Sequence, residues 1–256
     1  MTNGLIDFSA VLIPVIVAAA AAVMIVVELR APGRPWPKVA GWWTRAILLN
    51  SVQVAIVFVS GVAWDPWMRS ARPWSAADAL GTTGGAVAGY LAITFIYYWW
   101  HRWRHEVPLL WRWLHQVHHS PQRIEVITSF YKHPFEIIVN SLLSSAILYL
   151  LVGLDPRTAS FAVMVTGLAE LFYHWNVSTP HWVGYLFQRP ESHCVHHQSG
   201  LHKYNYADLP LWDMLFGTFR NPRQWTDSCG FADEERRLGA MLAGVDVNAP
   251  GKGATS

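Results

Sequence analysis

Long apolar runs separated by short polar connections dominate the first two thirds of the chain. A helix needs about twenty apolar residues to cross the hydrocarbon core of a bilayer. Runs close to that length occur at 8–27, 43–63, 79–100, 135–153 and 157–175. The last two are shorter, are separated only by GLDPR, and the fifth contains Glu170 and His174. The pattern therefore predicts an all-α integral membrane protein with four to five transmembrane helices.

The start of the chain favours a retained first span. The residues MTNGLIDFS lack the positively charged region of a secretory signal, and the apolar stretch after them is too long for one. Composition agrees with the membrane assignment, since 52% of residues are apolar, 14% are charged and fifteen are tryptophan, which favours the water–lipid interface. A net charge of +2 without a basic patch argues against nucleic acid as a partner.

The distribution of lysine and arginine predicts the orientation, because cytoplasmic segments retain an excess of both. The segments 28–45 and 101–134 are rich in basic residues, whereas 64–78 is balanced. Five spans with the N-terminus outside would place both basic segments and the C-terminus in the cytoplasm, with the protein in an inner or plasma membrane. Residues 1–78 then form N-terminal transmembrane helices, and 221–256 form a polar tail with one short helix near 232–243.

Histidines gather in three clusters that border the apolar runs. His101 and His105 are one helical turn apart, and two HxxHH sequences follow, each with i, i+3, i+4 spacing that predicts one helix face. Prolines before and after the second cluster predict separate short helices. A further candidate closes the fifth apolar run. The nine candidate ligands are His101, His105, His115, His118, His119, His174, His193, His196 and His197.

A metal centre explains such crowding better than core packing does. A single histidine on an apolar face is usually a core residue, and we keep that interpretation for His133, His181 and His202. Clustered imidazoles repel one another when protonated and need partners for their ring nitrogens when neutral. Eight or nine of them exceed the four ligands of one zinc ion, so two ions are indicated, and iron, copper, nickel or zinc would accept imidazole. The zinc-protease motif HExxH is absent because position 109 is leucine.

The order HRWRH, HQVHH, His174 and HCVHH, followed by KYNYADLPLWDMLFGTF, resembles the fatty acid hydroxylase superfamily, also called the sterol desaturase family. The resemblance covers roughly residues 85–220. Two positions depart from the family pattern: His174 stands alone where some members have a histidine pair, and Ala207 stands where glycine often follows Asn-Tyr. Within the stretch that follows HCVHH, the residues that carry the resemblance are Asn205, Tyr206, Trp212, Asp213, Leu215, Phe216, Gly217 and Thr218.

The resemblance implies a membrane-bound non-haem di-iron enzyme that uses O2 to hydroxylate a lipid C–H bond. Residues 79–220 would be the catalytic domain, with a cytoplasmic helical cap carrying the histidine boxes. No flavin or iron–sulfur motif is present in the sequence, so we expect a separate electron donor, such as a ferredoxin or cytochrome with its reductase. Metal-bound imidazoles usually donate their second N–H to a nearby acceptor. The candidate partners are Glu136, Glu170, Asn176, Asn205, Asp208 and Asp213.

Three alternatives remain open at this point. A desaturase would use the same histidines. A metal-handling membrane protein would be expected to place its ligands near the bilayer midplane, whereas these border the apolar runs. A haem-binding electron carrier would need paired histidines on facing spans within the bilayer.

Overall fold

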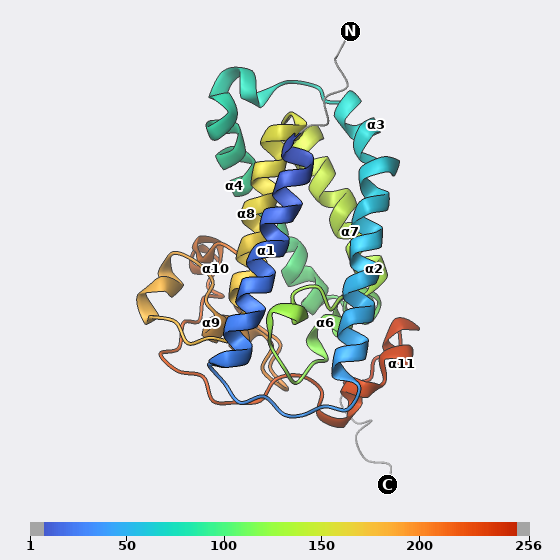
Figure 1. Cartoon of the computed structure of the whole chain (residues 1–256), viewed down its shortest axis with the longest axis vertical. Helices are drawn as coiled ribbons and strands as arrows, with labels where there is room; N and C mark the ends of the chain where they lie inside the picture. Colours follow the sequence, from blue (N-terminus) through green and yellow to red (C-terminus); the bar gives the residue numbers. More distant parts are fainter. Residues whose placement is uncertain (1–7, 250–256) are drawn as a thin grey trace.

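The computed structural model describes residues 8–249, and within that range the fold is almost entirely helical (Figure 1). No strand occurs there, and the only β feature is an isolated bridge between Gln198 and Cys229. The first seven residues, which precede the predicted first span, and the last seven residues of the tail lie outside the described part. The predicted all-α class is confirmed.

Six helices make up the first part of the fold as far as the second histidine cluster, together with one π-helical turn. They are α1 (Phe8–Arg30), α2 (Trp42–Ala63), α3 (Asp65–Ser70), α4 (Ala76–Glu106), α5 (Pro108–Leu110), the π-helical η1 (Trp111–His115) and α6 (Gln116–His119). The remaining elements alternate between helices and short turns. They are η2 (Val126–Thr128), α7 (Pro134–Ser145), the π-helical η3 (Ala146–Leu151), α8 (Pro156–His174), η4 (His181–Tyr185), α9 (Pro190–His196), α10 (Pro210–Leu215), η5 (Ala232–Arg236) and α11 (Leu238–Leu242).

Four stretches are helical, long and apolar enough to cross a membrane: Leu12–Arg30, Trp42–Ser70, Asp78–Glu106 and Pro134–Leu151. The chain is therefore an integral membrane protein, at the lower end of the predicted four to five spans. The fifth apolar run forms α8, a 19-residue helix that begins at Pro156 and contains Arg157 and Glu170. It packs against α1 and α4. The side of the membrane on which each end lies stays a prediction.

The outer surfaces of the spans are apolar, and a glycine allows one close contact between them. Val54 and Phe58 of α2 are 70% and 74% exposed, as expected for side chains that face lipid. Gly89 lies where α4 meets the α7–α8 hairpin, and a Cβ atom there would come within 2.7 Å of Leu154. Close approach of this kind is how membrane helices gain packing energy.

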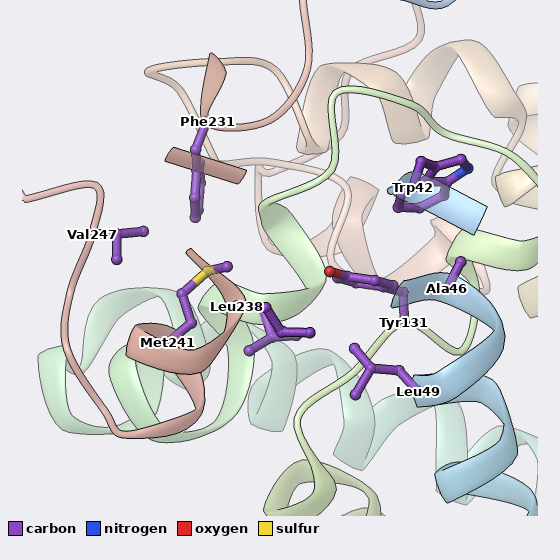
Figure 2. Packing of buried hydrophobic residues seen from close by; sticks show 9 residues of the cluster. Trp42, Ala46, Leu49, Tyr131, Phe231, Leu238, Met241 and Val247 are labelled. Atoms are coloured by element: carbon purple, nitrogen blue, oxygen red, sulfur yellow. The ribbon is translucent and has the colours of Figure 1, made fainter. Parts of the chain in front are cut away.

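The polar tail is joined to the bundle by an apolar cluster (Figure 2). The predicted short helix near 232–243 is present as η5 and α11. Leu238 and Met241 of α11 pack in one cluster with Trp42 of α2 and with Tyr131, which lies just before α7. The tail therefore closes the end of the bundle at which α2 begins.

A glycine in the turn before α8 provides a test of the packing. Gly153 has φ +75°, and a Cβ atom there would lie 2.3 Å from the Trp74 ring. We expect Gly153→Ala to lower the melting temperature in detergent by about 5–10 °C, because both the backbone and the indole must shift. Gly61→Ala in α2 is the control, since nothing lies within 4 Å of its Cβ position. Equal melting temperatures for the two variants would contradict this packing.

Candidate metal centre

All nine predicted histidines meet at one end of α4, in two adjoining groups. The first group is His101, His105, His115, His119 and His196. The second group is His118, His174, His193 and His197. Within each group, one ring nitrogen from every member lies within 4.8 Å of the others. No predicted ligand is left outside the two groups.

Each HxxHH sequence contributes to both groups. This differs from the prediction that the three histidines of each HxxHH sequence share one helix face. Instead, His115 and His119 enter the first group while His118 enters the second. Around a helix, residue i+3 lies about 60° from residue i and about 100° from residue i+4, on the other side of residue i, and this rotation separates the histidines. The last HxxHH sequence shows the inverse arrangement, with only His196 in the first group, so both HxxHH sequences span the two groups.

The two groups touch through several imidazoles. The rings of His119 and His197 stack with centroids 4.1 Å apart, and those of His196 and His193 stack with centroids 5.3 Å apart. Four elements supply the histidines: the end of α4, the η1–α6 turn, the last residue of α8, and α9 with the residue after it. A centre built on several packed elements is held more firmly than one built on a single loop.

Backbone carbonyl groups set the direction of several rings. The Nδ1 atoms of His101 and His196 lie 2.7 Å from the carbonyl oxygens of Tyr206 and Tyr204, and Nδ1 of His174 lies 2.9 Å from that of Glu170. Because a carbonyl oxygen only accepts, each Nδ1 carries the proton, and each Nε2 keeps its lone pair. Such bonds fix the tautomer of a metal-ligating histidine.

The lone pairs that face the interior are poorly satisfied by the protein. The Nε2 atoms of His105 and His196 and both ring nitrogens of His197 are buried without a hydrogen-bond partner in the described structure. Elsewhere nitrogen faces nitrogen, as between Nε2 of His101 and Nε2 of His115 at 3.0 Å. Unsatisfied buried polar atoms are costly, and a cation shared by several imidazoles would satisfy them. The residues therefore fit a metal centre.

One predicted carboxylate contacts a candidate ligand directly. Oε1 of Glu136 accepts from Nδ1 of His115 at 3.1 Å, and the same oxygen pairs with the guanidinium group of Arg104. Glu136 is fully buried and Arg104 is 4% exposed. In the sequence, Arg104 is one of the basic residues of the segment 101–134 that predict the cytoplasmic side. Only its position, one residue before His105, could have linked it to the centre.

The other predicted partners act through the backbone or lie apart from the histidines. Glu170 offers its carbonyl oxygen to His174, while its carboxylate pairs with Lys132. Asp213 accepts from the N–H groups of Tyr206 and Ala207, and so fixes the segment that offers a carbonyl oxygen to His101. Ala207 itself is not left-handed, so the turn does not require glycine at this position.

Three polar side chains hold the loops around the centre. The side chain of Asn205 donates to the backbone carbonyl oxygen of Ser192. The backbone carbonyl oxygen of Asn205 accepts from the side-chain amide of Gln188, and the nitrogen of that amide lies 3.0 Å from Nδ1 of His193. Asn176 instead bonds to the backbone of Arg34. Within residues 8–249, neither Asn176 nor Asp208 makes a side-chain hydrogen bond to a histidine. Burial raises the pKa of Asp208 to about 7.

Two of the three histidines assigned to the core have structural roles, and the third lies at the centre. His133 accepts from the N–H of Phe135 and begins α7, and His181 donates to the carbonyl oxygen of Asn221. Nδ1 of His202, in contrast, lies 3.2 Å from Nδ1 of His119. Its backbone is left-handed, with φ 44°. His202 lies outside the three histidine clusters of the sequence, so no spacing pattern predicts this contact.

The metal-free protein should lose stability as the pH falls. Burial lowers the pKa of His196 to about 3 and that of His202 to about 4, from an ordinary 6.5. Between those values and 6.5 the unfolded chain binds more protons, so each such group removes about 1.4 kcal/mol of stability per pH unit of acidification. We expect a melting temperature that is level from pH 8 to 7 and falls steeply below about 6.5. A level profile down to pH 5 would contradict this burial.

The fold and the centre define a class: an integral membrane protein whose helices hold two adjoining groups of histidines. The family model of the fatty acid hydroxylases matches residues 86–218, which is more than half of the chain and contains all nine histidines. The chain therefore belongs to the fatty acid hydroxylase family, and the predicted resemblance is confirmed.

Several curated proteins are similar to the chain. Very-long-chain aldehyde decarbonylase GL1-9 of Oryza sativa subsp. indica is 33% identical over 46% of this chain and 47% of its own length. Human alkylglycerol monooxygenase is 30% identical over a stretch that covers 61% of this chain and 34% of that protein. Ornithine lipid hydroxylase OlsE of Rhizobium tropici is 34% identical over a stretch that covers 53% of this chain and 42% of that protein. The chain thus spans less than half of the length of these relatives. No solved structure matches it significantly.

Proposed function

We propose that the chain is a membrane-bound di-iron oxygenase that uses O2 to hydroxylate a C–H bond of a lipid. The observation that carries the proposal is the pair of adjoining all-histidine groups at the end of a membrane-spanning helix. Membership of the fatty acid hydroxylase family supports it, as do relatives named as a monooxygenase and a lipid hydroxylase.

Each histidine group would hold one iron ion, and the ions would supply activation of O2. The protein's own contribution is to position the ligands and to exclude water. Carbonyl oxygens hold the rings of His101, His174 and His196 with Nε2 directed inward. All the ligands of the second group are buried, which keeps the reacting atoms away from bulk water.

The carboxylate of Glu136 adds a negative charge behind His115, which favours a cation on the other side of that ring. Aromatic side chains border the first group. The ring of Tyr206 lies 5.4 to 5.7 Å from those of His101, His105 and His196, and beyond it Tyr98 stacks on Phe216. These rings form an apolar wall against which a hydrocarbon chain can lie.

The proposal includes an orientation and an electron supply. We place the histidine groups and the C-terminus on the cytoplasmic side, because basic residues are concentrated in 28–45 and 101–134. Hydroxylation puts one oxygen atom of O2 into the substrate and releases the other as water, which requires two electrons. These would come from a separate ferredoxin or cytochrome with its reductase, and residues 79–220 would form the catalytic domain.

Metal analysis and spectroscopy of detergent-purified, iron-loaded protein test the proposal. We expect two magnetically coupled irons per chain by Mössbauer spectroscopy and O2-dependent oxidation of them once they are reduced. Lipid extracts of expressing cells should then contain a product heavier by one oxygen atom. A product lighter by two hydrogens would instead indicate a desaturase. Tightly held zinc without O2 reactivity after iron substitution, or a haem absorption band, would contradict the proposal.

A further inference from the structure

Two short segments near the centre expose apolar side chains that the described structure leaves uncovered. The first is the η4 segment at 181–187, and the second is the α10 segment at 209–219. Their strongly exposed residues are Trp182, Tyr185, Leu186, Phe187, Leu211, Met214, Leu215 and Phe216. The two segments are in contact with each other. The first segment contains no charged residue, and the one charged residue of the second, Asp213, is 1% exposed.

We call the surface formed by these exposed apolar side chains the η4–α10 face. Contiguous apolar surfaces of this kind mark interaction sites.

The η4–α10 face continues the outer surface of a membrane-spanning helix. Trp212 of α10 donates to Oγ1 of Thr94 in α4, and its ring lies 5.0 Å from that of Phe95. Phe216 packs at 4.9 Å against Trp99 of α4. On the same helix, Leu91 and Phe95 are 40% and 38% exposed. Side chains of α10 therefore adjoin the part of α4 that faces lipid.

The height of the face along the bundle matches the bilayer rather than the aqueous phase. In Figure 1, α10 lies at the side of the bundle, level with the middle part of α1 and not beyond its lower end. Since α1 crosses the membrane between Leu12 and Arg30, this level lies within its span. A protein that covered the face would have to enter the bilayer to do so.

Cations follow the second segment. Arg220 and Arg223 are both exposed and come directly after the apolar stretch. The guanidinium group of Arg220 stacks over the Tyr204 ring at 4.1 Å. Apolar side chains bordered by arginine are typical of surfaces that insert at the boundary between acyl chains and anionic head groups.

We propose that the η4–α10 face is embedded in one leaflet of the bilayer. From the sequence we expected these residues in a cytoplasmic cap, whereas here the two segments lie in lipid. The inference does not depend on the proposed reaction. It does bring lipid close to the centre, because Phe216 stacks on Tyr98, which contacts Tyr206 beside His101.

Spin-label accessibility on the full chain in liposomes tests the inference. A nitroxide is attached to a cysteine at one test position, in the variants Leu215→Cys and Leu186→Cys. Phe58→Cys is the lipid-facing reference, and Arg237→Cys is the aqueous reference. The native Cys194 and Cys229 are buried, and label uptake by the unsubstituted chain checks that they do not react. Collision rates with O2, which concentrates in lipid, and with a water-soluble nickel chelate are then compared at each position.

We expect Leu215 and Leu186 to show an oxygen-to-nickel ratio close to that of Phe58 and well above that of Arg237. A ratio like that of Arg237 would overturn the inference by placing the face in water. Low collision rates with both reagents would overturn it in favour of a covering protein, such as a second copy of the chain. If a leucine variant fails to fold, Trp182→Cys and Met214→Cys report on the same face.

Discussion

The His119→Ala variant is expected to lose lipid oxidation by more than about 100-fold and to bind less iron, because loss of even a residue behind a ligand costs about 10- to 100-fold. His119 belongs to the first histidine group, and its ring stacks on that of His197 in the second. The variant leaves all four histidines of the second group in place. We therefore expect iron content to fall from two ions toward one and the magnetic coupling to disappear from the Mössbauer spectrum.

The matched control for this variant is His181→Ala. That substitution also removes an imidazole, but one that donates to the carbonyl oxygen of Asn221 and belongs to neither histidine group. Its iron content and coupling should remain those of the unsubstituted chain. If His119→Ala kept two coupled irons, His119 would not be a ligand, and the proposed first group would be wrong.

The helices and the set of histidines that gather at the centre could be predicted from the sequence because local spacing encodes both. An apolar run long enough to cross a bilayer forms a helix, because lipid offers no hydrogen-bond partner for backbone polar groups and a helix pairs them internally. The histidines are detectable because eight of the nine lie in short repeated patterns, and a shared cation is a simple way to satisfy so many rings.

The division of the ligands into two groups could not be predicted from spacing alone. The i+3 histidines, His118 and His196, join the group opposite to that of their own box. The outcome depends on how the end of α4, the α6 turn and α9 pack, and no local pattern describes that packing. The π-helical turn η1, which ends at His115, also could not be predicted, because the apolar periodicity of the sequence does not distinguish a π-helical turn from an α-helical one.

Backbone acceptors were also invisible in the sequence. Three histidines of the centre direct a ring nitrogen at the carbonyl oxygens of Glu170, Tyr204 and Tyr206, and a carbonyl group is present at every residue. What selects these three is backbone conformation. Tyr204 and Asn205 have φ of 69° and 50°, which is unusual for residues other than glycine and is held by the side-chain bonds of Asn205.

The Glu136→Gln variant is expected to show the second largest effect, through both stability and metal affinity. Glutamine keeps an acceptor for Nδ1 of His115 but removes the negative charge that the buried Arg104 guanidinium faces. A buried charge left without its partner costs about 3–5 kcal/mol, so the melting temperature of the metal-free variant should fall markedly. The loss of negative charge behind His115 should also weaken iron binding by about 10- to 100-fold.

The double variant Arg104→Met, Glu136→Gln separates these two effects. It removes the stranded cation together with the carboxylate, so the metal-free protein should recover most of its melting temperature. Iron affinity should stay low, because the ring of His115 still lacks a negative charge behind it. Iron titration and thermal unfolding of the same preparations measure both quantities. Recovery of iron affinity together with stability would mean that Glu136 serves only to neutralise Arg104, and the carboxylate would then have no role in holding the metal.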